Sequence, residues 1–148
     1  MRFAMLTAEK NETFTPDFGG ARLTRANLEG ANLSNAKAQF VDFREANLKH
    51  ATLVGALLQG ADFGKANLQH ADFARAELKG ANLKGANLSG AQLNLANDLT
   101  QEQLESAFGD AATSLPFGLR APTHWAESSL DELDTILEWK SWQSRSAN

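Results

Sequence analysis

Residues 76–93 read AELKG ANLKG ANLSG AQL, a repeated unit of five residues that decides the fold. The same unit runs without insertion from Pro16 to Leu95, and a large apolar residue stands at the centre of each unit. Fifteen of the sixteen centres are Leu or Phe, and the exception is Ala38. Ala lies two positions before the centre in fourteen units, Asn or Asp separates the two in ten, and Gly follows two positions after the centre in seven.

A period of five residues fits neither an α-helix nor a single strand. On an ideal helix a step of five residues advances about 500°, so the apolar stripe would spiral around every face. Regularly placed glycines argue against a helix too, because each costs a helix interior roughly 0.5–1 kcal/mol. Alternate residues of an extended segment share a face, so each centre and the Ala before it point inward together. Asn, Asp and Gly suit sharp turns between such segments. The pattern predicts a solenoid of short extended sides.

The A-(N/D)-L-x-x unit resembles the pentapeptide-repeat family over about 80 of the 148 residues. This resemblance implies an all-β solenoid, a right-handed quadrilateral β-helix with four units in each coil. Residues 20 apart would then stack directly, and sixteen units would make about four coils. We expect the open ends of such a solenoid to be capped. The predicted division is an N-terminal cap at 1–15, the β-helix at 16–95, and a short helical C-terminal cap and tail at 96–148.

Helix signals follow the last repeat. Thr100 and Gln103 fit a capping box and Gly109 fits a stop, so a short helix is predicted at 101–108. A second helix is predicted from Ser129, which forms another capping box with Glu132. The run from LTQEQL at 99–104 through GD and LPFGLRAP to HW at 124–125 resembles the tail of many bacterial pentapeptide-repeat proteins, and we expect it to fold back over the last coil.

Composition limits the class of protein. The chain has 148 residues, a net charge of −4 and no cysteine, which fits one domain without disulfides or thiolate metal sites. No apolar run is long enough to span a membrane, and the first residues lack a secretory signal. A cytoplasmic protein is therefore expected.

Apolar residues at positions that should face solvent are the candidate protein-binding surface. Clustered exposed apolar groups usually mark contact with another molecule. A partner protein, a second copy of the chain, or a terminal segment of the same chain could cover this cluster. The second helix carries a further stripe that could dock on the shaft, pair in a homodimer or bind a partner. The candidate residues are Phe40, Val54 and Leu57 on the shaft and Leu130, Leu133, Leu137, Trp139 and Trp142 in the second helix.

Stacking at 20-residue intervals would also align two sets of polar residues. Asn27, Asn47, Asn67 and Asn87 form one column, which could be a recognition ladder or amides bonded to one another or to corner backbone. His50 and His70 share an outer edge and could share a metal ion, although metal sites usually need three or four ligands. A solvated edge is the simpler interpretation, and no metal or cofactor is predicted.

Charge separates the functions that the family resemblance suggests. The resemblance implies, as one activity, protection of a type II topoisomerase such as DNA gyrase by a protein that mimics DNA. Mimicry of that kind needs a strongly negative surface. Residues 16–95 hold nine bases and seven acids, a charge of +2, whereas residues 96–148 hold three bases and nine acids, a charge of −6. The shaft is therefore a poor DNA mimic and, with mixed signs, a poor nucleic-acid binder.

No enzyme signature is present. The stretch GADFGK at 60–65 resembles a phosphate loop but is one residue too short and lacks Ser or Thr after Lys65. The three histidines have no evident triad partners. We therefore expect a non-enzymatic interaction or scaffold protein that takes no small-molecule substrate and binds another protein, with topoisomerase protection as the alternative.

Overall fold

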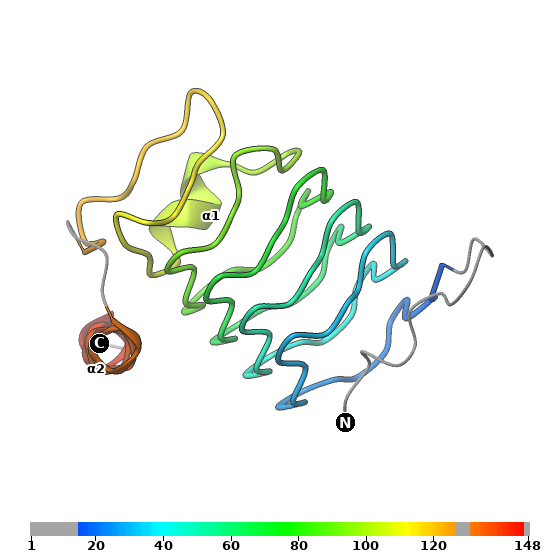
Figure 1. The fold of residues 1–148 in the computed structure, drawn as a ribbon, viewed down its shortest axis with the longest axis horizontal. Helices are drawn as coiled ribbons and strands as arrows, with labels where there is room; N and C mark the ends of the chain where they lie inside the picture. The colour runs from blue at the N-terminus through cyan, green and yellow to red at the C-terminus, as the bar shows by residue number, and fades with distance from the viewer. Residues whose placement is uncertain (1–14, 127–130, 147–148) are drawn as a thin grey trace.

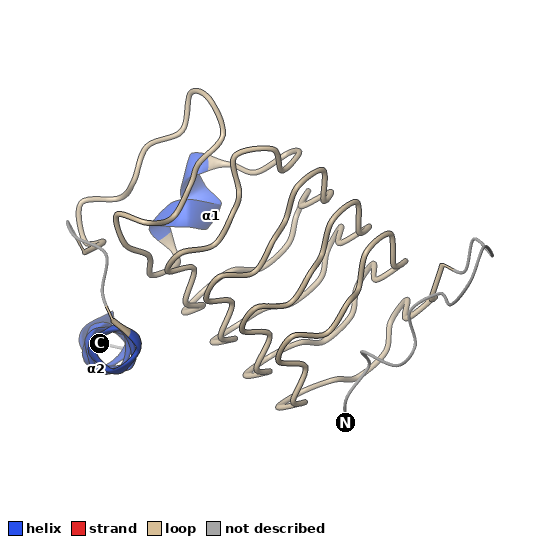
Figure 2. Cartoon of the chain, viewed as in Figure 1, coloured by secondary structure: helices blue, strands red, loops and turns tan. Residues whose placement is uncertain are grey.

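Residues 15–126 and 131–146, which the computed structural model describes, form a solenoid of stacked coils with two helices toward its C-terminal end (Figure 1). The predicted cap at 1–15 falls almost entirely outside these residues. The helices are α1 (Gln101–Glu105) and α2 (Glu132–Ser146). Figure 2 shows the coils themselves without regular strands, because each side contributes one isolated β-bridge between two turns.

The stacking register is 20 residues. Parallel bridges join Asp17 to Lys37, and the series continues at five-residue steps to the bridge between Glu77 and Asn97. Backbone bonds link each coil to the next in both directions. For example, Leu48 donates to the carbonyl of Asn67 at 2.8 Å, while Asn67 donates to the carbonyl of Ala46 at 2.9 Å. Each coil therefore serves as the hydrogen-bonding template for the next.

Every corner of the shaft is a β-turn. The N–H of each inward Ala donates to the carbonyl of the preceding centre, as Ala76 does to Phe73 at 2.9 Å. The second turn residue has a positive φ throughout, between 57° and 77° from Gly20 to Gly90, as a type II turn requires. Seven of these residues are glycines. The other eight are Arg25, Asn35, Phe40, Glu45, His50, Lys65, His70 and Arg75.

The frequent Asn and Asp before each centre stabilise these corners. The Asn67 side-chain oxygen accepts from the N–H of Gln69 at 3.1 Å, and Asp72 accepts from Ala74 at 3.0 Å. The amide oxygens of Asn27, Asn47 and Asn87 do the same for the residue two positions on. Such local bonds satisfy turn N–H groups that have no ladder partner. The Asn column is therefore bonded to corner backbone, one of the two interpretations the sequence left open.

The interior confirms the alternation predicted from the sequence. Centres and inward Ala residues from Ala31 to Leu93 are almost all fully buried. The rings of Phe43 and Phe63 stack with centroids 5.1 Å apart, and Phe73 meets Phe63 edge-on at 6.2 Å. Each such pair adds about 0.5–1.5 kcal/mol beyond the burial of apolar area.

The winding continues beyond the last five-residue unit. After α1, Phe108 bridges Asn87 and Ser114 bridges Gln92, at spacings of 21 and 22 residues. The Thr100–Gln103 capping box is present as predicted. The helix predicted at 101–108 is wrong in extent, because α1 ends at Glu105. The carbonyl of Phe108 instead accepts from Leu88 at 2.7 Å, which requires extended backbone there.

Helix α2 begins at Glu132, and Ser129 lies outside the described residues. Among the described residues the N-cap of α2 is Asp131, whose carboxylate accepts from the N–H of Asp134 at 2.8 Å. Figure 1 shows α2 end-on beside the last coil. Neither α1 nor α2, the helices of the described residues, has the length and apolar character needed to cross a membrane.

Candidate functional site

An apolar patch, defined as Phe40, Val54 and Leu57, lies around one side of the shaft. Phe40 is 73% exposed, while Val54 and Leu57 are half-buried. The Phe40 ring lies against Gly60 of the next coil, at a place where a Cβ on Gly60 would collide with the ring. Leu57 lies on the side between the turns Leu53–Ala56 and Leu58–Ala61, and Val54 is the first central residue of the earlier of these two turns. Val54 and Phe40 therefore lie at opposite ends of the side that carries Leu57, with Phe40 one coil earlier.

The helix residues of the predicted surface point in two directions. Leu133 and Leu137, one turn apart, are 65% and 57% exposed. Trp139 instead turns to the shaft, where its indole N–H donates to the carbonyl of Gly85 at 2.8 Å. Gln143 Nε2 donates to the same carbonyl at 3.0 Å. Helix α2 therefore docks on its own shaft, and its leucines remain on the outer face.

Leu130 lies outside the described residues. Trp142 also faces inward, because its ring stacks on His124 at 5.2 Å and meets Phe108 at 6.0 Å. The His124 Nε2 donates to the carbonyl of Ala107 at 2.7 Å, and this bond fixes the orientation of the imidazole. Trp142 thus anchors the C-terminal half of α2 against the segment that follows α1.

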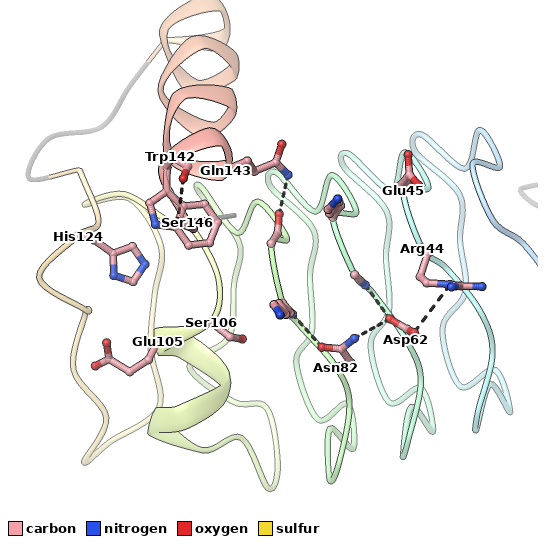
Figure 3. Close-up of a pocket in the computed structure, with 14 residues that line it drawn as sticks. Arg44, Glu45, Asp62, Asn82, Glu105, Ser106, His124, Trp142, Gln143 and Ser146 are labelled. Atoms are coloured by element: carbon pink, nitrogen blue, oxygen red, sulfur yellow. Dashed lines mark hydrogen bonds and ion pairs between the residues drawn. The ribbon is translucent and has the colours of Figure 1, made fainter. Parts of the chain in front are cut away.

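A groove of about 700 Å³ lies where α2 meets the shaft (Figure 3). One wall is a row of polar side chains that crosses three coils. Arg44 donates to both oxygens of Asp42, at 2.9 and 2.7 Å, and its Nε lies 3.9 Å from Asp62. Asp62 in turn accepts from Asn82 at 2.9 Å. The hydrogen bonds from Arg44 hold the pKa of Asp42 well below its usual range.

The opposite wall comes from the C-terminal segment. Figure 3 shows Trp142, Gln143 and Ser146 of α2 facing the groove, with Glu105 and His124 beyond Ser106. Lys65 and Lys84 also line the groove. Neither lysine side chain makes a hydrogen bond or an ion pair with another described residue.

His50 and His70 stack as the 20-residue register predicts, with ring centroids 5.0 Å apart. His70 packs against Gly90, where any Cβ would collide with the imidazole. Partial burial lowers the pKa of His70, and the neighbouring His50 lowers it further. Within the described ranges no cluster of three or more potential ligands could hold a metal ion, so the two imidazoles stand without a third donor.

The repeat pattern and stacking register agree with a comparison of the sequence against protein families. The family model for the pentapeptide repeat region matches residues 17–100. The chain belongs to the pentapeptide repeat family. Pentapeptide repeat proteins form right-handed quadrilateral β-helices. No curated protein matches the sequence closely enough to count as a relative.

Several solved pentapeptide repeat proteins are similar to this one. HetL from the cyanobacterium Nostoc, involved in heterocyst differentiation regulation, is 27% identical over 71% of this chain, with a TM-score of 0.43. The match spans 57% of the length of HetL. Rfr23 from the cyanobacterium Cyanothece is 31% identical over 68% of this chain and 82% of its own, with a TM-score of 0.39. A thylakoid-lumen protein from Arabidopsis thaliana is 23% identical over 82% of this chain and 84% of its own, with a TM-score of 0.37.

Sequence reasoning on this pentapeptide repeat protein missed the groove. The row of Asp42, Asp62 and Asn82 could have been found, because these residues stand 20 apart on the same outward position. The wall formed by His124 and Trp142 carried no such signal, since it depends on how the C-terminal segment returns to the shaft.

Proposed function

We propose that this chain is a non-enzymatic, cytoplasmic protein-binding module whose apolar patch contacts a partner protein. Residues 16–95 would supply the rigid shaft and residues 96–148 its C-terminal cap. Membership of the pentapeptide repeat family supports the general role, because members are generally structural or interaction modules.

Phe40 is the observation that carries the proposal. Its φ is 60°, a region that costs a residue with a Cβ roughly 1–2 kcal/mol. The stacked residues Gly20, Gly60 and Gly80 fill the same corner in the other coils with glycine, which has no such cost. Phe40 adds strain and also leaves 73% of its surface in solvent. A residue that costs the fold stability and exposes a ring is best explained by a contact with another molecule.

The outer face of α2 is the second part of the proposed surface. Leu133 and Leu137 are exposed although the helix is already anchored through Trp139 and Gln143. This face could bind the same partner or a second copy of the chain. Light scattering on the full chain and on a Leu133→Ser/Leu137→Ser variant distinguishes the two, since only a homodimer would lose half its mass.

Topoisomerase protection by DNA mimicry is the less favoured function. Acidic side chains on the shaft lie beside basic ones, as Asp42 does with Arg44 and Glu45 with Arg25 at 3.5 Å. Mimicry needs a continuous negative face rather than such pairs. A gyrase supercoiling assay in the presence of a quinolone tests this directly, and protection of the enzyme would favour the alternative.

Site-specific photo-crosslinking in the native host tests the proposed patch. A benzophenone amino acid replaces Phe40 in one strain and Phe117 in another, because Phe117 is an exposed aromatic residue too but lies in the C-terminal loop. We expect a discrete crosslinked protein from position 40 and none from position 117. A Phe40→Gly variant should fold at least as stably and lose the partner. Equal crosslinking from both positions, or undiminished partner capture by Phe40→Gly, would contradict the proposal.

A further inference from the structure

The first coil of the shaft, residues 16–35, has an open edge. In the second coil both backbone groups of Asn47 bond to the first coil, its N–H as donor at 2.9 Å and its carbonyl as acceptor at 2.7 Å. The equivalent groups of the first coil have no earlier coil to meet. Three of its four sides therefore present an N–H and a carbonyl that bond to no described residue, and these belong to Arg22, Asn27 and Asn32.

The apolar core is also incompletely covered at this end. Ala21, Ala26 and Phe18 point inward but are only half-buried, although they pack against the core. One coil further on, Phe43 and Ala46 are fully buried. A row of unpaired backbone groups is a template for pairing with another chain, and covering the apolar end removes its surface from water. Both effects favour the addition of another coil at this end.

The opposite end of the shaft is closed. Leu88 of the last repeat coil donates to the carbonyl of Phe108 at 2.7 Å. The side chain of Gln103 in α1 donates to the carbonyls of Leu78 and Ala81, both at 2.9 Å. Head-to-tail stacking, which would produce a filament, needs both ends open. The chain can therefore add a coil at its N-terminal end alone.

From these observations we propose that two copies of the chain stack through their first coils as a symmetric dimer. The open sides follow one another around a square, so one extended peptide can pair with a single side, whereas a coil of the same winding can pair with all three. Each open side carries both a donor and an acceptor, so the edge is complementary to itself when a two-fold axis makes the paired strands antiparallel. Residues 16–35 hold two acids and two bases, so net charge does not oppose the contact. Because the far ends are closed, association stops at two copies.

Residues 1–14 of the same chain are the competing occupant of this edge. Counting back in the five-residue frame puts Asn11 and Thr13 at the two inward positions of the unit before Pro16. Every unit from Pro16 to Leu95 has apolar residues at both of these positions. The sequence before Pro16 therefore does not continue the core pattern, which favours a second copy as the occupant.

This inference goes beyond the proposed function and does not depend on it. The Phe40 ring lies against Gly60 of the third coil, on the side away from the open edge. Crosslinking at position 40 should therefore be the same in a monomer and in a dimer. The two proposals can fail independently.

Amide hydrogen exchange and light scattering on the full chain test the dimer. With rising protein concentration the mass should approach twice the 16.0 kDa of one chain. The amides of Arg22, Asn27 and Asn32 should then exchange about tenfold more slowly or better than in dilute protein, because pairing protects them. The Phe117 amide is the control, since it bonds to no described residue at the other end of the molecule and should exchange fast at every concentration.

Matched variants locate the contact. Arg22→Pro removes an N–H that has no described acceptor and places a ring on the edge, where proline is tolerated. It should keep the circular dichroism spectrum of the parent and remain a monomer. Arg22→Ala removes the same charge but keeps the N–H, so it should still dimerise, as should Leu133→Ser/Leu137→Ser.

Four outcomes would overturn the proposal. The first is a parent that stays a monomer at millimolar concentration. The second is a dimer whose three edge amides exchange as fast as in dilute protein. The third is equal protection of these amides at every concentration, which would assign the edge to residues 1–14. The fourth is a dimer that survives Arg22→Pro but not Leu133→Ser/Leu137→Ser. If Arg22→Pro fails to fold, the exchange measurement on the parent still decides.

Discussion

Replacing Arg75 with glycine should stabilise the shaft. Arg75 occupies a corner at φ 60°, is exposed, and has no ion pair among the described residues. Relief of the left-handed conformation is worth about 1–2 kcal/mol for a residue with a Cβ. Glycine loses roughly 0.5–1 kcal/mol more conformational entropy on folding. The expected gain in the free energy of unfolding is therefore about 0.5–1 kcal/mol. Gly55, one coil earlier in the same column, has φ 69° and shows that the corner accepts glycine.

Urea unfolding followed by circular dichroism measures this change. The shift in the urea midpoint is converted to a free energy of unfolding with one m-value for all variants. The corresponding rise in Tm is about 1–4 °C for a domain of this size. Arg75→Ala is the control, because it removes the side chain and keeps the Cβ, so its stability should stay close to that of the parent. Arg75→Val should be less stable than either, since β-branched residues tolerate positive φ least. If Arg75→Gly were less stable than Arg75→Ala, the strain of a positive φ would not be what separates glycine from other residues at this corner.

Three further outcomes follow from other contacts. Gly109→Ala should destabilise the protein by about 1–3 kcal/mol in urea unfolding, because a Cβ there would lie 2.5 Å from the Trp125 ring; an unchanged midpoint would mean that the ring moves freely. Thr100→Ala should cost about 1 kcal/mol through loss of the capping box, and Thr100→Ser, which keeps the hydroxyl, should cost much less. Burial and His50 depress the pKa of His70, so the unfolded chain binds the proton more readily. Stability should therefore fall as pH drops below about 6.5, and His70→Gln should flatten this dependence; a parent protein equally stable at pH 5 and pH 7.5 would contradict it.

The sequence predicted the shaft well because its five-residue unit is read directly as inside and outside positions. Phe63 and Ala61 occupy the two positions of the unit that point inward, and both are fully buried. The positive φ at the corners was harder to predict from the sequence. Gly60 marks a positive φ by its identity, but Phe40 and Arg75 adopt the same conformation without any residue preference that would reveal it.

The C-terminal segment was predicted less well, because tertiary contacts there outweigh local pattern. The apolar stripe of α2 indicated a helix correctly but not which face meets the shaft. Trp139 and Gln143 meet it because Gly85 offers a carbonyl to their N–H groups, while Leu133 and Leu137 stay outside. Periodicity reports which residues share a face, and it does not report what chemistry the opposing surface has. The same limit explains why α1 was predicted three residues too long.

The spacing of 21 and 22 residues after α1 has a practical consequence for engineering. One extra residue enters between Asn97 and Phe108 and a second between Phe108 and Ser114, and the ladder continues after each of them. A corner can thus absorb added length while the hydrogen-bonding frame on either side is kept. Loops grafted at this point, between Asn97 and Phe108, should leave the earlier coils intact and would present new segments at the mouth of the groove.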